Sequence, residues 1–427
     1  MIDDALILYR AAAVRDSLDT NARPGAVAAR HRMIRAAGDE TSVLREVGKP
    51  DRIIDLGDVL LMPSMVNAHA HLDLTHQPRV PYNGNFIDWL KGVIQSRVTD
   101  EHAITAAVHD GLRMSYESGV RGLADIAGSP AALRALLLSP HDYDLLGQGF
   151  LEVTGFGKRG LEAAKAGGEL LKHYRIEDDE IHLHRQGGAS AFFTGLEPHA
   201  PYSTGREAYQ YATTQLCCST HLAETLEEAQ FVRDATGPFA DLLKRLGKWD
   251  DSIQPQGVSP VQYLRPHFEE SKALDKPRWL VAHCNYVDDA DIQTLADTQT
   301  SVAYCPVASD YFHHRNHRYR DMLEAGVNVC LGTDSIICQP EEEPQPLSIL
   351  AQMRHLYRRD QTDPAQLLRM ATNNGAVAIG ERIVIGMLRP GRNDNFTAVR
   401  FDPHDETDPL IQVLLNHEPA LSIGPSR

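Results

Sequence analysis

Short apolar runs alternate with amphipathic stretches from about residue 63 to residue 382. Continuous or period-two apolar runs predict buried strands, and apolar residues at every third or fourth position predict helices. Eight candidate strands follow one another in this region, at residues 64–67, 119–125, 145–153, 194–197, 219–221, 279–283, 301–305 and 327–332. The helices predicted between them include residues 101–117, 161–174 and 290–297. This repeat of strand and helix predicts an α/β fold with a parallel sheet.

Eight such units match the size of a (β/α)8 TIM barrel, which takes about 250 residues. The alternative is a doubly wound open sheet, but the first strand lacks the glycine-rich phosphate turn of that fold. Both chain ends instead carry short apolar runs between charged turns: 5–9 and 59–61 near the start, and 382–386 and 396–401 near the end. We expect residues 1–62 and 383–427 to form one small β-sandwich domain, and residues 63–382 to form the barrel. In the first part we expect short antiparallel strands, with a loosely ordered connection over the mixed-charge segment 30–52.

Composition and charge exclude several classes of protein. The chain has 427 residues, a formal net charge of −16 and six cysteines without a CxxC pair. The acidic balance argues against a nucleic-acid partner, because phosphate binding relies on basic surface. No apolar run approaches the roughly 20 residues that cross a bilayer, and the acidic start lacks the pattern of a secretion signal. We therefore expect a cytoplasmic protein with reduced thiols, a small-molecule partner and no membrane contact, whereas a homo-oligomer stays open.

Side chains that bind metals or move protons coincide with the predicted strand ends, where a (β/α)8 barrel carries its chemistry. His69 and His71 are two residues apart at the end of the first strand, so their side chains point to the same face of the strand. The later candidates at strand ends are His199, His221 with Glu224 one turn on, His283 and Asp334. Each has an ordinary structural explanation, such as a helix cap for Asp334. Their recurrence at the same end of successive strands favours one shared metal site.

The segments around these residues resemble the amidohydrolase superfamily, and within it the nucleoside and aminopurine deaminase branch. The matching segments, in the family's order, are VNAHAHLDL at 66–74, PHAPYS at 198–203, HLAET at 221–225, AHC at 282–284, YCPVAS at 304–309 and LGTDS at 331–335. The resemblance implies a distorted TIM barrel with a β-sandwich built from both chain ends. That fold agrees with the pattern of strands and helices.

The resemblance also implies a metal centre. Its ligands would be His69, His71, His221 and Asp334, a set that suits zinc more than ferrous iron. Binuclear members of the family bridge two metals with a lysine that ends the fourth strand. Here that strand ends Glu-Pro-His, so we expect one metal. Glu152 ends the third strand and is either an additional ligand or a structural or substrate-side carboxylate.

The implied activity is metal-dependent hydrolytic deamination. A divalent metal lowers the pKa of water towards neutrality. Asp334 and His283 would orient the attacking water, and Glu224 would carry its proton to a ring nitrogen of the substrate. Ammonia would then leave the carbon that carried the amino group.

Three further residues bear on the substrate. In the resembling deaminases the histidine of PHAPYS contacts the base or ribose, which makes His199 a substrate-binding candidate. Trp89 either stacks on the base or packs its loop. Arg97 stands where methylthioadenosine and S-adenosylhomocysteine deaminases carry an acidic residue that holds the ribose, and an arginine fork suits a carboxylate.

That substitution resembles the aminodeoxyfutalosine deaminases of menaquinone synthesis, whose substrate joins an adenosine-like half to a benzoate. We therefore expect aminodeoxyfutalosine or a related adenosine derivative as the substrate. A chlorohydrolase or a guanine-type heterocycle deaminase is the closest alternative, since the same catalytic residues would serve it. An inactive homologue that only binds metal is an alternative of another class.

Overall fold

Eight parallel strands form the centre of the molecule. The computed structural model describes residues 4–138, 143–184, 191–273, 279–380 and 384–424. Two four-stranded parallel sheets contain β8 (Met65–Ala70), β9 (Val120–Ala127), β10 (Leu146–Val153) and β11 (Ala191–Pro198), and then β12 (Ser219–Leu222), β13 (Leu280–His283), β14 (Ser301–Tyr304) and β15 (Val329–Leu331). Bridges from Leu196 to Cys218 and from Ala70 to Asp334 join the two sheets at both edges. The strands therefore close into a TIM-type barrel, and each predicted strand is present.

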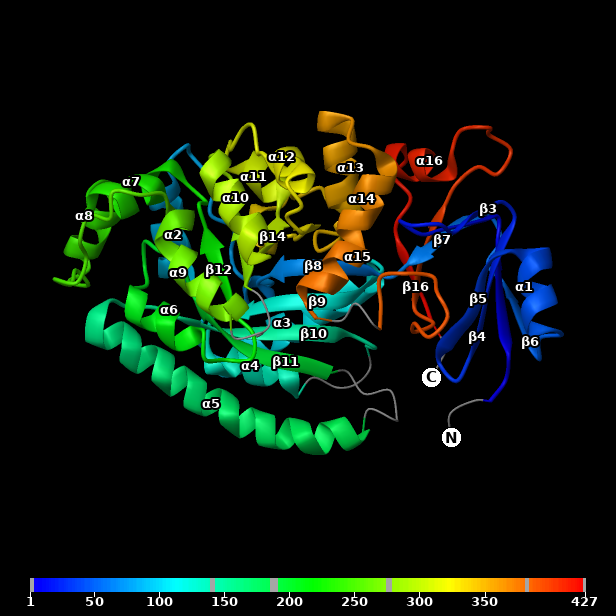
Figure 1. Ribbon diagram of the computed structural model, residues 1–427, viewed down its shortest axis with the longest axis horizontal. Coiled ribbons are helices and arrows are strands. Elements are labelled where there is room, and N and C mark those ends of the chain that lie inside the picture. The colour runs from blue at the N-terminus through cyan, green and yellow to red at the C-terminus, as the bar shows by residue number, and fades with distance from the viewer. Residues whose placement is uncertain (1–3, 139–142, 185–190, 274–278, 381–383, 425–427) are drawn as a thin grey trace.

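Helices surround this ring, as Figure 1 shows. In chain order they are α2 (Phe86–Ser96), α3 (Glu101–Glu117), α4 (Pro130–Leu137), α5 (Gly157–His184), α6 (Arg206–Ala212), α7 (Leu226–Asp234), α8 (Pro238–Arg245), α9 (Pro260–Ala273), α10 (Asp289–Thr298), α11 (Pro306–Tyr311), α12 (Tyr319–Glu324), α13 (Ile349–Asp360), α14 (Pro364–Ala371), α15 (Asn373–Ala378) and α16 (Pro409–Leu415). Many begin at a capping side chain, such as Asp100 before α3 and Ser129 before α4, which satisfies a free backbone N–H. Within the described residues, no helix has the length and apolar character needed to cross a membrane.

The inside of the barrel is a packed core. A buried cluster there contains Val66, Ala68, Ala124, Ile126, Phe150, Leu280, Ala303 and Cys330. These side chains come from β8, β9, β10, β13, β14 and β15 and fill the space between the strands. Because the interior is filled, the polar residues at the carboxyl ends of the strands lie above packed apolar side chains rather than around an open pore.

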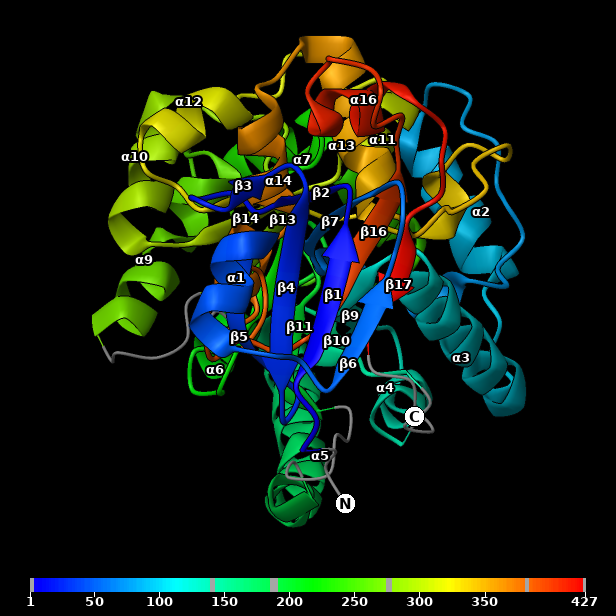
Figure 2. The same cartoon turned by 90° about the vertical axis from the view of Figure 1, so that its right-hand side faces the viewer.

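The two ends of the chain meet in two smaller sheets. One has the order β5-β4-β1-β6 and the other β17-β16-β7-β2-β3. Their strands are β1 (Ile7–Ala11), β2 (Ala13–Arg15), β3 (Asn21–Ala22), β4 (Gly25–Arg30), β5 (Met33–Asp39), β6 (Arg52–Asp55), β7 (Val59–Pro63), β16 (Phe396–Arg400) and β17 (Leu421–Ile423). The antiparallel pairing of β16 with β7 links the late chain to the early chain, and Figure 2 shows β16 and β17 beside the blue strands.

A shared apolar cluster connects these two sheets, with the rings of Tyr9 and Phe396 5.2 Å apart. The grouping of residues 1–62 and 383–427 as a separate sandwich domain, and of residues 63–382 as the catalytic domain, remains a prediction. Residues 381–383, where the second boundary falls, lie outside the described residues.

Three local expectations were wrong. The early strands are not all antiparallel, because β1 pairs in parallel with β6 and β2 with β7. The segment 30–52 contains β5 and then helix α1 (Glu40–Val47), which Asp39 caps by accepting from the backbone N–H of Ser42. The strand predicted at 382–386 is not found in its described part, residues 384–386, which forms a turn and bends. Gly386 has a φ of 88° and therefore departs from the extended conformation.

Candidate metal centre and active site

The first predicted strand end is tied to the last one. Asn67 on β8 donates from Nδ2 to the Thr333 hydroxyl at 2.7 Å and accepts the Thr333 backbone N–H at 3.1 Å. The backbone N–H groups of Thr333 and Asp334 both donate to the His69 carbonyl at 3.0 Å. These bonds across the barrel seam hold Asp334 beside His69, near the end of β8, and His71, directly after it.

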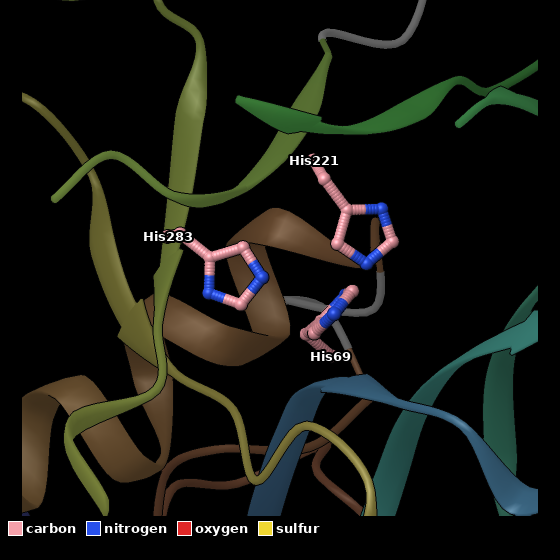
Figure 3. Close-up of side chains that lie close together, drawn as sticks. All are labelled: His69, His221 and His283. Carbon is pink, nitrogen blue, oxygen red and sulfur yellow. The ribbon is translucent and has the colours of Figure 1, made fainter. Parts of the chain in front are cut away.

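The four predicted ligands converge. The Nε2 atoms of His71 and His221 are 3.2 Å apart, and His71 Nε2 lies 3.6 Å from Asp334 Oδ1. The ring of His69 lies 4.8 Å from the ring of His221 and 5.0 Å from that of His71. His283 joins the cluster, since one of its nitrogens lies within 4.8 Å of nitrogens of His69 and His221. Figure 3 shows the rings of His69, His221 and His283 pointing toward one another.

The cluster has the chemistry of a site for a divalent metal. The Nε2 atom of His69 is buried, and the described residues give it no hydrogen-bond partner. Burial, reinforced by the neighbouring His221, holds the pKa values of His69, His71 and His283 well below their usual range, so these imidazoles keep free lone pairs. Nitrogens bound tetrahedrally to one zinc ion at about 2.1 Å would be about 3.4 Å apart, close to the spacing of His71 and His221.

Glu224 lies beside the cluster at the turn after β12. Its Oε1 is 3.7 Å from His283 Nε2, and the Tyr202 hydroxyl donates to its Oε2 at 3.4 Å. Burial raises the pKa of Glu224 to about 8, although His221 opposes the change. A carboxyl group with a pKa near neutrality can both accept and return a proton.

Sequence reasoning missed Glu228, which fixes the backbone around Glu224. Its buried carboxylate accepts the backbone N–H of Ala223 at 2.9 Å and that of Glu224 at 2.8 Å. These bonds stabilise a turn in which Ala223 has a φ of 50°, a conformation that costs free energy outside glycine. The Thr-x-x-Glu spacing from Thr225 to Glu228 was the available signal, but it predicts only a helix cap.

Glu197 was also missed as a site residue. It is the last but one residue of β11, directly before the PHAPYS segment, and its side chain is completely buried. Its Oε1 lies 3.1 Å from His221 Nδ1, the ring nitrogen on the other side from the contact with His71. Burial lowers the pKa of His221, but the nearby carboxylates of Glu197, Glu224 and Asp334, with Glu197 the strongest, together outweigh that effect and raise it. The sequence showed this residue only as the place where a bridging lysine is absent.

The predicted substrate residues have different surroundings. The ring of His199 lies 4.9 Å from that of His221, and its Nδ1 is 2.7 Å from the Ser203 hydroxyl. Trp89 on α2 is buried, and its ring packs edge-on against that of Phe312 at 4.7 Å.

Arg97, directly after α2, pairs with the buried Asp73, with 3.1 Å between Nη2 and Oδ2. Glu152 acts electrostatically on both of these residues. This places the acidic end of β10 near the Arg97–Asp73 pair. The arginine is therefore not an uncompensated cation.

Comparisons with known proteins agree with this architecture. The model of the amidohydrolase family matches residues 60–419. A curated 5-methylthioadenosine/S-adenosylhomocysteine deaminase of Pelotomaculum thermopropionicum is 28% identical over 401 residues, which cover 90% of this chain and 82% of the relative.

Two solved structures share the fold. Helicobacter pylori aminofutalosine deaminase in complex with methylthio-coformycin superposes with a TM-score of 0.78 at 19% identity, over 97% of both chains. An adenosine deaminase from Xanthomonas campestris with bound zinc gives a TM-score of 0.72 at 18% identity, over 97% of this chain and 90% of that one. With the family match over most of the sequence, the chain belongs to the amidohydrolase family.

Proposed function

We propose that the protein is a metal-dependent hydrolytic deaminase that acts on a 6-aminopurine nucleoside and releases ammonia. The observation that carries this proposal is the contact between a buried cluster of histidines and Glu224, a carboxyl group whose pKa is raised to about 8. The name of the methylthioadenosine/S-adenosylhomocysteine deaminase relative supports the same reaction class.

One divalent metal would be held by His69, His71, His221 and Asp334. Zinc is preferred over iron, because three imidazoles and a carboxylate form a usual zinc ligand set. When bound, the metal supplies a water whose pKa is lowered towards neutrality. Two observations support a shared ion: Nε2 of His69 has no hydrogen-bond partner among the described residues, and Nε2 of His71 lies only 3.2 Å from Nε2 of His221.

The proton transfers fall to this chain's own residues. Glu224 would accept a proton from the attacking water and deliver it to the ring nitrogen next to the amino-bearing carbon. His283, 3.7 Å from Glu224, and Asp334 would orient the water. The amino group would leave as ammonia once protonated. Because Glu224 and His283 are both buried, the protons would stay within the site rather than exchange with bulk water.

For the substrate we propose aminodeoxyfutalosine or a related adenosine derivative, as in menaquinone synthesis. His199 would contact the base or ribose, and Trp89 would form part of the pocket wall. The side chain of Arg97 is 33% exposed, and the part that Asp73 does not cover would bind the benzoate carboxylate. The pairing with Asp73 also favours a second candidate, a methylthioadenosine-type nucleoside without a carboxylate, because it reduces the positive charge available.

We also propose a cytoplasmic location with a small molecule as the partner. Cys284, Cys305, Cys330 and Cys338 are buried free thiols, which agrees with a reducing compartment.

A panel of substrates tests the proposal. The metal-loaded protein would be assayed for ammonia release from adenosine, methylthioadenosine, S-adenosylhomocysteine, aminodeoxyfutalosine, guanine and a chlorinated triazine. We expect ammonia from the 6-aminopurine nucleosides, with the highest kcat/KM on aminodeoxyfutalosine. Ammonia from guanine alone, or chloride release without ammonia, would move the protein to the closest alternative, and no turnover at all would favour the inactive homologue.

A further inference from the structure

The side chain of Glu197 is a buried carboxylate whose environment offers almost no compensation. Its exposed fraction is 0%, and apart from the contact of Oε1 with His221 neither carboxylate oxygen has a hydrogen-bond partner among the described residues. The charged groups that act on it are His221, which is attractive, and Glu152 and Asp334, which are repulsive. A buried carboxylate is costly in its charged form, so a positive charge nearby is needed to keep it ionised.

The only attractive group among these is an imidazole of the predicted metal centre. His221 Nδ1 lies 3.1 Å from Glu197 Oε1 and 3.1 Å from the carbonyl oxygen of His199, to which its N–H is directed. A carbonyl and a carboxylate are both acceptors, so Nδ1 carries the hydrogen. The lone pair of Nε2 therefore points to the cluster, on the side of His71.

The two acceptors have separable effects on His221. The His199 carbonyl takes the N–H and selects the tautomer, whereas the carboxylate adds negative charge beside the ring. Negative charge at the protonated nitrogen makes the opposite nitrogen a stronger donor to a metal. The position of Glu197 on the Nδ1 side, and its absence from the groups of possible ligand atoms within the described residues, argue against Glu197 as a ligand.

We propose that Glu197 is a positioning residue of the metal centre, whose buried charge strengthens the bond from His221 to the ion without ligating it. The proposal rests on the proposed function, because it requires a metal at His69, His71, His221 and Asp334. It also gives the end of the fourth barrel strand a role in a chain that lacks the bridging lysine of binuclear relatives.

The test is the metal affinity of Glu197→Gln, which keeps the shape and removes the charge. The dissociation constant for zinc would be measured by competition with a chromophoric chelator, together with the metal-to-protein ratio and thermal unfolding of the metal-free protein. We expect the dissociation constant for zinc to rise about 10- to 100-fold, while the metal-to-protein ratio at saturation stays at one. The thermal unfolding of the metal-free protein should change little. The absorption bands of the cobalt(II)-loaded variant should shift, which a purely structural role would not cause.

Asp394→Asn is the matched control. Asp394 is 2% exposed and pairs with Arg32, so the substitution removes an equally buried carboxylate outside the histidine cluster. Zinc affinity in this variant should equal that of the wild type. If it falls as far as in Glu197→Gln, the effect is general to buried charge and the proposal is overturned.

The outcomes for Glu197 and for the metal centre are distinguishable. A wild-type protein that binds no zinc refutes the proposed metal centre. A wild type that binds zinc, with a Glu197→Gln variant that binds it equally well, refutes only the role of Glu197. A metal-to-protein ratio that falls from two to one would make Glu197 a ligand and also overturn the proposal. If Glu197→Gln does not fold, Glu197→Asp should bind zinc about tenfold more weakly, and wild-type affinity in that variant would contradict us.

Discussion

The carboxylate of Glu224, at the turn after β12, lies 3.7 Å from Nε2 of His283, which ends the neighbouring strand β13. Burial raises the pKa of Glu224 to about 8 and holds the pKa of His283 well below its usual range. Their environments therefore keep a protonatable carboxyl group next to a neutral imidazole. Such a pair, with pKa values displaced in opposite directions, is a typical arrangement for acid and base roles.

Replacement of a predicted ligand should remove the metal without unfolding the protein. In His71→Ala, the ring whose Nε2 lies 3.2 Å from His221 is lost, so the ion loses one of four donors. We expect metal content, measured by elemental analysis after dialysis, to fall below about a tenth of the wild-type value, with deamination lost in parallel. The exposed His102→Ala on α3 is the control and should keep its metal. Wild-type metal content in His71→Ala would exclude that residue from the ligand set.

Arg97→Ala should separate acidic from neutral substrates. A hydrogen bond to a charged group contributes about 1.5 to 3 kcal/mol, so kcat/KM for a carboxylate-bearing nucleoside should fall about 10- to 100-fold. Adenosine, which has no carboxylate, should be affected far less. Lys91→Ala on α2, the helix that precedes Arg97, is the control for loss of a positive charge, since the Lys91 side chain pairs with Asp88. Equal losses on both substrates would reject the carboxylate role of Arg97.

Gly128→Ala should displace the same guanidinium without removing it. A Cβ atom at Gly128 would lie 1.6 Å from Nη2 of Arg97 and 2.9 Å from Oδ2 of Asp73. Because the end of an arginine side chain is flexible, the protein should fold and Arg97 should move. We expect steady-state kinetics to show the substrate-selective loss of Arg97→Ala, in a weaker form. Unchanged discrimination between acidic and neutral nucleosides would show that the observed position of Arg97 is not needed.

The barrel and much of the site could be predicted from the sequence, because both follow from local signals. Apolar runs bounded by turns located the strands, and the strand ends carried His69, His71, His221 and Asp334 to one rim. The position of a strand end decides where such a residue lies in a barrel, so no long-range information was needed.

The roles of Glu197 and Glu228 could not be predicted in this way. The contact from Glu197 to His221 depends on how β11 and β12 are aligned, which no local pattern specifies. The carboxylate of Glu228 turns back to the Ala223 and Glu224 backbone, whereas its sequence pattern predicts only a cap. The same limitation explains the pairing of Arg97 with Asp73, since a lone arginine in a sequence says nothing about its neighbours.

Acid should destabilise the fold partly through His267, which is buried on α9. Burial, reinforced by Arg206, lowers its pKa to about 4, against about 6.5 in an unfolded chain. Between these values the unfolded chain binds a proton that the folded chain does not, so the free energy of unfolding decreases as the pH falls from 6.5 towards 4. The full contribution, present above pH 6.5, is about 3 kcal/mol.

Denaturant unfolding of His267→Phe at several pH values checks this contribution. The aromatic replacement keeps the stacking against Tyr209, whose ring centre is 6.0 Å away, and removes the titrating group. The variant should lose less stability than the wild type between pH 6.5 and pH 4. Parallel curves for the two proteins would assign the acid sensitivity to other groups.

Metal content and ammonia release of Glu224→Gln, measured on the same sample, test the central claim most directly. The amide keeps the size of the side chain but cannot carry the proton, and Glu224 is not among the four predicted ligands. We therefore expect one metal per chain, as in the wild type, with deamination reduced at least about 100-fold. Wild-type turnover in a metal-loaded Glu224→Gln sample would contradict the account.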